Sequence, residues 1–345
     1  MATLYTETIT PAELTGFARA AQDDIEAKQG TLARWLPNTS VNDVVVRTVV
    51  DQDGSGDLAE YRSFDAETPI GSGGKAERKI FELMPLGKKE RISEYNQLRA
   101  RGGDTAGLLL SSVEKATVRR VQGIVKRLEV ARGQALETGA LNINENGLVQ
   151  APSFGRPAGN TVTAAVLWDA STGTKILEDL IAWSSVYKDS NDGNAPGSIV
   201  VSNRILSVML RDPGVRSLVA TTAGTPQIVS NEVLNATLAA YGLPPIYVYD
   251  RKVNGTRVTS DNKVFLLPEA VDPNSGSNNL GATFYGPTLE ADEPEYGIGA
   301  SDQPGIAVGV YKTKDPIGLW VHSNAIALPV LVNPVASMVA TVLAA

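Results

Sequence analysis

Cysteine is absent from this chain, and histidine occurs once, as His322. Without cysteine the chain has neither disulfides nor thiolate metal sites, and a reducing cytoplasm is its natural setting. With a single histidine, the nucleophile triads common in hydrolytic enzymes are poorly supplied. His322 lies close to Trp320 in the sequence, and we interpret it as a packed strand residue.

An excess of positive charge is also lacking, because 38 acidic residues oppose 31 basic residues and give a net charge of −7. Free-standing nucleic-acid-binding domains usually carry a basic excess, so this class is disfavoured. The charge is uneven. Residues 75–132 hold fourteen Lys and Arg against seven Asp and Glu, whereas residues 269–302 hold seven acids and no base. The two regions could meet between copies of the protein, or both could be solvated surface.

Three motifs resemble ligand or catalytic sites but lack a required member. Residues 71–75 resemble a phosphate-binding loop, yet Ala76 stands where a hydroxyl residue should bind magnesium. Residues 51–62 open like a calcium loop but end on Arg62 instead of a bidentate glutamate. The carboxylates of residues 290–295 lie in an irregular loop that fixes no separation between them. We therefore predict no catalytic, cofactor-binding or metal-binding residue.

Long hydrophobic helices are not indicated at the C-terminus either. Residues 325–345 carry no charge, but Pro329 and Pro334 interrupt them and valine is frequent. This pattern favours short buried β segments over a membrane-spanning helix, so no membrane partner is predicted. A membrane-anchored C-terminus is the alternative.

Two helices are predicted in the N-terminal half. Thr10-Pro11-Ala12-Glu13 resembles a capping box, and it predicts a helix from Pro11 to about Gln29. A second helix of about 50 Å is predicted between Thr105 and Thr138, with Gly139 as its stop. Its apolar residues return every three or four positions, at Leu110, Val113, Thr117, Val121, Ile124, Leu128, Ala131 and Ala135.

Before the long helix, residues 42–83 read as two β runs joined by a polar, glycine-rich segment. An isolated two-stranded ribbon is marginal in water, so the parent domain or a neighbouring subunit must cover its apolar side chains. The combination suggests a subunit built for assembly. Beyond Pro152, helices near residues 174–188, 202–212 and 230–241 alternate with short strands and indicate an α/β domain.

Seven short stretches, taken together with their order and spacing, resemble a known protein family over nearly the full chain. They are Arg34–Pro37, Phe64–Gly71, Leu128–Gly133, Tyr241–Pro245, Ser301–Gly305, Asp315–Pro316 and Ala327–Pro334. Through these stretches the chain resembles tailed-bacteriophage major capsid proteins, specifically the capsid protein E family.

The resemblance implies an α+β fold of the Hong Kong type found in phage major capsid proteins. Residues 1–41 would form an N-terminal arm and residues 42–83 an extended β-hairpin loop. A peripheral domain would combine residues 84–159 with residues 321–345 and carry a spine helix over about 105–138. Residues 160–320 would form an α/β axial domain.

The implied function is that of a structural protein, not an enzyme, which self-assembles through pentamers and hexamers. The icosahedral or prolate head shell would enclose double-stranded DNA without sequence-specific binding. The implied location is the virion, assembled in the bacterial cytoplasm with a separate scaffold protein, a portal and, in some shells, a decoration protein. An encapsulin-like nanocompartment shell and a soluble α/β enzyme are the alternatives.

The candidate subunit-interface residues lie in the hairpin, on the long helix and in the acidic loop. We expect a neighbour to cover the hairpin, and we expect the basic residues of the helix to meet acidic residues of a neighbour. The set is Val46, Ile70, Lys75, Arg78, Lys79, Phe81, Arg119, Arg120, Lys126, Arg127, Glu290, Asp292 and Glu293.

Overall fold

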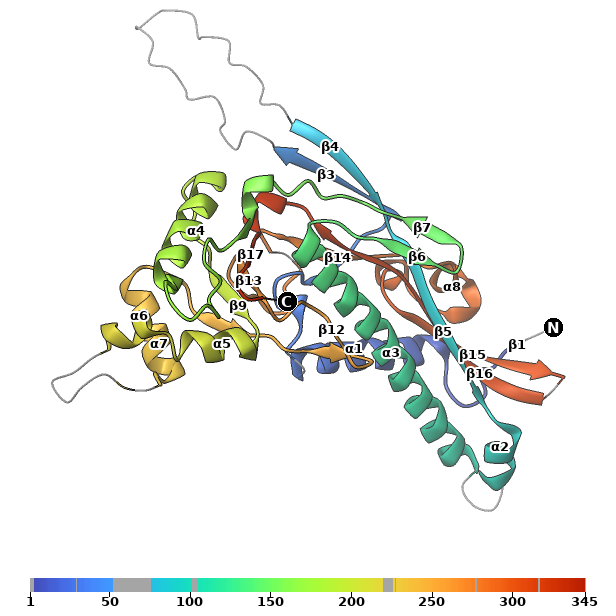
Figure 1. Cartoon of the computed structure of the whole chain (residues 1–345). Coiled ribbons are helices and arrows are strands. Elements are labelled where there is room, and N and C mark those ends of the chain that lie inside the picture. Colours follow the sequence, from blue (N-terminus) through green and yellow to red (C-terminus); the bar gives the residue numbers. More distant parts are fainter. Residues whose placement is uncertain are drawn as a thin grey trace, which may run out of the picture.

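Two sheets and one long diagonal helix dominate the computed structural model of the chain (Figure 1). The structure describes residues 3–28, 30–51, 76–100, 105–219, 226, 228–276, 278–315 and 317–344. Ile70 and Lys75, two of the candidate interface residues, lie outside these ranges.

The larger sheet has six strands and is built around β16 (Ile317–Leu331). One edge of β16 pairs first with β15 (Ala307–Lys314) and then with β14 (Gly281–Gly286), and the other edge pairs with β5 (Met84–Ile92). The short strands β1 (Thr3–Leu4) and β2 (Asn38–Ser40) complete it, next to β15 and β14.

Helices α1 (Pro11–Lys28) and α3 (Thr105–Thr138) cover one face of this sheet. The predicted capping box of α1 is present, because Thr10 N donates to Glu13 Oε2 at 3.1 Å and Glu13 N donates to Thr10 Oγ1 at 3.3 Å. The bounds of α3 match the prediction. It stops before Gly139, whose φ of 68° lies in the left-handed region that favours glycine.

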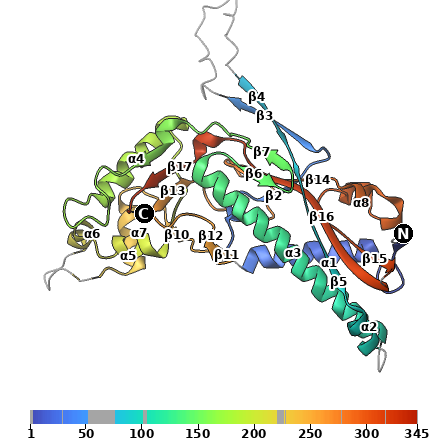
Figure 2. The same cartoon turned by 45° about the vertical axis from the view of Figure 1, so that its right-hand side comes forward.

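The smaller sheet has five strands in the order β10-β9-β13-β17-β8. Its helices gather at the end of the molecule away from α2 (Glu94–Ala100), as both views show (Figures 1 and 2). The strands are β8 (Thr161–Thr163), β9 (Ser198–Val201), β10 (Ile246–Val248), β13 (Lys263–Leu267) and β17 (Met338–Thr341), and the helices are α4 (Ile176–Ser190), α5 (Asn203–Met209), α6 (Pro213–Leu218) and α7 (Asn231–Ala240).

Three two-stranded ribbons and several short turns complete the described elements. The ribbon β3–β4 points away from the body of the molecule in both views (Figures 1 and 2). The ribbons are β3 (Val45–Asp51) with β4 (Ala76–Glu82), β6 (Ile143–Glu145) with β7 (Leu148–Gln150), and β11 (Lys252–Val253) with β12 (Thr256–Arg257). The short helices are α8 (Leu289–Asp292), η1 (Leu32–Arg34), η2 (Ala158–Asn160), η3 (Pro294–Tyr296), η4 (Ala300–Asp302) and η5 (Pro334–Ala336).

The sheets do not follow the expected domain boundary between residues 320 and 321, which falls inside β16. Strands β14 and β15, expected in the axial domain, pair with β16 in the larger sheet. Strand β17, expected in the peripheral domain, pairs with β13 and β8 in the smaller sheet. The pairing of strands that are distant in the sequence decides which sheet each strand joins. The predicted boundary instead divided the chain into consecutive segments.

A shared core joins the two sheets. Phe265 and Val339 from the smaller sheet and Leu328 and Val330 from the larger sheet belong to one buried cluster, together with Phe154. The uncharged C-terminal stretch forms buried β structure, as predicted, but it begins inside the 15-residue strand β16 and only β17, with four residues, is short. None of the helices in the described part of the chain combines the length and apolarity needed to cross a bilayer.

Candidate assembly surfaces

The β3–β4 hairpin has one face turned toward its own subunit. Val46 and Phe81 are only 7% and 5% exposed, and the Phe81 ring lies 5.4 Å from the ring of Phe154. Lys79 Nζ donates to the carbonyl oxygen of Phe154 at 3.1 Å. Because side chains alternate along a strand, these residues share a face and the base of the hairpin is anchored on its own core.

This anchoring gives three candidate interface residues of the hairpin contacts within their own subunit, and their contact with a neighbour stays a prediction. Val46, Lys79 and Phe81 were expected to be covered by a neighbour, but their own subunit already contacts them. Arg78 and Ile80 occupy the opposite face and are exposed, Ile80 at 63%. Both residues are accessible to a neighbour.

The basic surface of α3 also has partners within the subunit. Arg119 Nη2 and Arg120 Nε lie 2.5 Å and 3.0 Å from the carboxylate of Glu90 on β5. The hydrogen bond from Arg119 lowers the pKa of Glu90, although its partial burial opposes this. Arg119 and Arg120 thus share a carboxylate of their own chain, and their contact with acidic residues of a neighbour stays a prediction.

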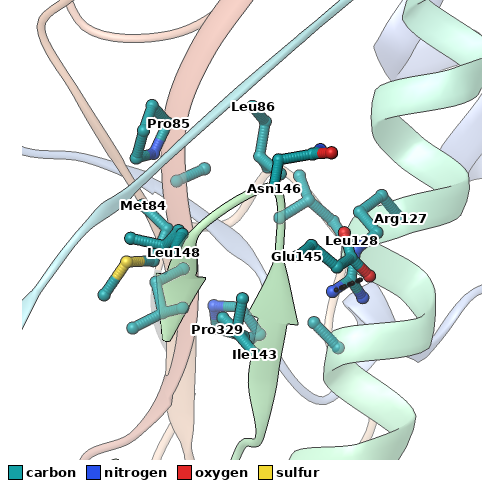
Figure 3. A pocket seen from close by; sticks show the side chains of 13 residues that line it. Met84, Pro85, Leu86, Arg127, Leu128, Ile143, Glu145, Asn146, Leu148 and Pro329 are labelled. Atoms are coloured by element: carbon teal, nitrogen blue, oxygen red, sulfur yellow. Dashed lines mark ion pairs between the residues drawn. The ribbon is translucent and has the colours of Figure 1, made fainter. Parts of the chain in front are cut away.

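Arg127 behaves similarly, because its Nη2 lies 3.1 Å from Glu145 on the β6–β7 hairpin (Figure 3). Lys126, the next residue along α3, is exposed. A polar groove beside α3 is lined by five cationic side chains and one carboxylate, Glu145, and two of the five cations pair with Glu90 outside this lining. The cations are Lys88, Arg119, Arg120, Lys126 and Arg127.

An apolar cavity of about 250 Å³ opens next to this groove, under the β6–β7 hairpin (Figure 3). Met84, Ile143 and Leu148 line it from the strands, and Leu128 lines it from α3. The pair Arg127–Glu145 stands at its side (Figure 3). The groove and the cavity therefore form one continuous surface.

The acidic loop is fixed to the opposite face of the larger sheet. Glu290 accepts two hydrogen bonds of 2.9 Å from Asn324 Nδ2 and lies 4.0 Å from His322 Nδ1. Asp292 accepts from Gln303 at 3.1 Å, and Glu293 is exposed. Glu290 thus anchors the loop in its own subunit, while Asp292 and Glu293 stay at the surface. His322 lies on β16, as predicted.

Arg132, a buried residue with two carboxylate partners, was not singled out from the sequence. Its guanidinium is fully buried and lies 2.8 Å from Glu26 on α1 and 3.5 Å from Glu129 on α3. Tyr249 donates to Glu129 at 2.5 Å. A signal existed, because Arg132 follows Leu128 by four positions and so lies on the apolar stripe of α3. Within the described ranges, His, Asp and Glu form no cluster of three that could hold a metal ion.

Solved structures with the same overall arrangement show the fold of the chain. A prophage protein from Escherichia coli CFT073, described as a capsid protein, matches with a TM-score of 0.62 at 13% identity, covering 99% of each chain. A phage-related protein from Bordetella bronchiseptica RB50 matches with a TM-score of 0.58 at 14% identity, covering 97% of each chain. No curated protein matches this chain in sequence. The fold is that of a phage capsid subunit.

The family follows from the sequence match. The model of the family described as phage major capsid protein E matches residues 17–342. The chain belongs to this family, and it is a structural protein of a phage shell, not an enzyme. The family membership favours the phage shell over the encapsulin-like alternative.

Proposed function

We propose that this chain forms pentamers and hexamers that close an icosahedral or prolate head around double-stranded DNA. Assembly in the bacterial cytoplasm would use a separate scaffold protein and a portal, and a decoration protein where the shell carries one. The acidic net charge of −7 supports a container whose lining does not hold DNA tightly.

The parts of the subunit have distinct roles in this proposal. Residues 1–41 are the arm and β3–β4 is the base of the extended loop. The larger sheet with α3 as the spine forms the peripheral region, and the smaller sheet with α4 to α7 forms the axial region. This division replaces the boundary at residue 320.

The observation that carries the proposal is the two-faced hairpin. Its inner face packs through Phe81 on the subunit, so the hairpin leaves the body in a fixed direction. Its outer face exposes Ile80, a large β-branched side chain, at 63%. Covering such a side chain with a neighbour removes apolar surface from water, which is the main favourable term in association.

Electron microscopy and size-exclusion chromatography of the expressed protein test this function. The protein is produced alone and together with candidate scaffold proteins from the same phage genome. We expect rings, shells or tubes with uniform wall thickness. A protein that stays monomeric with every scaffold, concentration and salt tried would contradict the proposal.

A further inference from the structure

Leu289 is the most exposed large apolar side chain among the described residues, at 81%. It opens α8, and its neighbours hold that turn rigidly. Thr288 Oγ1 accepts from Ala291 N at 3.3 Å, and Glu290 is bonded to Asn324 on β16. The turn therefore presents Leu289 outward in a fixed position. A single exposed leucine is ordinary, so its meaning depends on a matching surface.

The apolar cavity under the β6–β7 hairpin matches it in size and chemistry. Its volume of about 250 Å³ exceeds the ~150 Å³ of an engineered apolar cavity that binds benzene. One leucine side chain fits in such a space. Leu86 and Leu148, both half-buried, line the cavity together with the buried Leu128 (Figure 3).

The charges around the two features are complementary. Asp292, Glu293 and Glu295 follow Leu289 and are exposed. The groove that continues from the cavity holds five cationic side chains against two carboxylates that pair with them, Glu90 and Glu145, so it keeps a net positive charge. Opposite charge at the rim of an apolar contact steers association and fixes register.

The two features lie on opposite faces of the larger sheet, so one subunit cannot satisfy both by itself. The Val308 side chain points to the α1 side, whereas the space above Gly309 is filled by Tyr296, which follows α8 in the same loop. The cavity lies on the side of α3. A contact between such surfaces is head-to-tail, and head-to-tail contacts generate rings when they close.

We propose that Leu289 of one subunit inserts into the cavity beneath the β6–β7 hairpin of a second copy. The carboxylates after Leu289 then lie along the basic groove of that copy, near Lys126. This contact rests on the proposed function as a shell subunit, and it assigns a partner surface to the acidic loop.

Cysteine cross-linking tests the contact, because the natural chain contains no thiol. The variant Leu289→Cys with Leu148→Cys is assembled and then oxidised. We expect a ladder of covalent trimers and larger species on a denaturing gel, since each subunit links to two different neighbours. The matched control pairs Leu289→Cys with Val149→Cys, the adjacent residue on β7, which is 67% exposed and does not line the cavity. It should give no ladder.

Particle yield provides a second readout that does not depend on disulfides. Leu289→Asp should lose most of the particles at a concentration where the natural protein assembles, whereas Leu289→Met should keep them. Full assembly of Leu289→Asp, or equal ladders from the Leu148 and Val149 pairs, would overturn the contact. A ladder from Ile80→Cys with Leu148→Cys in its place would assign the cavity to the β3–β4 hairpin and also overturn it.

The outcomes separate this contact from the proposed function. If the natural protein forms particles and the Leu289 pair does not link, only the contact is rejected. If the natural protein forms no rings or particles under any condition, the proposed function itself fails.

Discussion

At the scale of single residues, Arg132 shows how charge is held in the interior. Its buried guanidinium interacts with Glu26 and Glu129, donates to Asn38 Oδ1 at 2.7 Å and donates to Thr283 Oγ1 at 2.8 Å. Removing one partner of a buried ion pair leaves an uncompensated charge, which is more costly than the pair was favourable. Arg132 thus ties α1, α3, β2 and β14 together.

We expect Arg132→Met to lower the free energy of unfolding by about 3–5 kcal/mol, because two buried carboxylates lose their cation. Urea unfolding followed by circular dichroism measures this. The matched control is Arg127→Met on the same helix, which breaks a partly exposed pair with Glu145 and should change stability by about 0–1 kcal/mol. Similar losses of stability in both variants would contradict the larger contribution of the buried network.

Two glycines of α3 give a second residue-level prediction. A Cβ on Gly123 meets nothing within 4 Å, whereas a Cβ on Gly133 would lie 2.5 Å from Val258. Gly123→Ala should therefore stabilise the protein by up to about 1 kcal/mol through helix propensity. Gly133→Ala should destabilise it despite the same gain in propensity. Thermal unfolding of both variants checks the sign, and stabilisation by Gly133→Ala would contradict the close approach of Val258.

At the scale of elements, two adjacent residues of the β3–β4 hairpin are expected to have different roles. Phe81 stabilises the fold, and Ile80 takes part in assembly. Phe81→Ala removes a buried ring and should cost about 3–5 kcal/mol of stability. Ile80→Asp changes an exposed side chain and should leave stability within about 0.5 kcal/mol while particle yield falls. Denaturant unfolding and electron microscopy are measured on the same samples. If Ile80→Asp assembled normally, the outer face of the hairpin would have no role in the shell.

The junction of α3 with the smaller sheet predicts a pH dependence. Glu137 lies 2.7 Å from Lys263 Nζ on β13 and accepts from Ser260 Oγ at 2.6 Å. Burial opposes its ionisation, but these partners together lower the pKa of Glu137 below its usual 4.5. Because the folded pKa is depressed, this stabilisation is complete above the unfolded pKa and is lost as pH falls through the folded pKa.

Glu137→Gln should therefore show a smaller loss of stability than the natural protein when the pH is lowered from about 5 to about 3. Unfolding in urea at several pH values measures the difference. The double variant Glu137→Gln with Lys263→Met should show no further flattening if the pair acts as a unit. Parallel pH profiles for the natural protein and Glu137→Gln would refute the coupling.

Local sequence signals predicted individual helices well, but they could not predict which distant strands pair. The helix of residues 105–138 followed from its apolar spacing and from Gly139, and α1 followed from its capping box. Helix α6 was missed although Asp212 and Pro213 form a cap and a first helical position. Alternation along β4 could have shown that Phe81 and Ile80 face opposite ways. The pairing of β17 with strands of the smaller sheet depends on strand registers that no local sequence pattern contains.

At the scale of the whole molecule, basic and acidic side chains gather on different surfaces. The basic groove lies on the α3 side of the larger sheet, and the acidic loop lies on the other side. Much of the predicted interface charge is neutralised within the subunit, because Glu90 and Glu145 already contact Arg119, Arg120 and Arg127. Sequence could locate the charged regions, but it could not show these internal partners.

The central claim is that the outer face of the β3–β4 hairpin becomes buried on an adjacent copy when the shell closes. A reconstruction of assembled particles by electron cryomicroscopy tests it most directly. We predict that Arg78 and Ile80 lie against a neighbouring subunit while Phe81 keeps its contact with Phe154 of its own chain. Closed particles in which Arg78 and Ile80 face solvent in every copy would contradict the account.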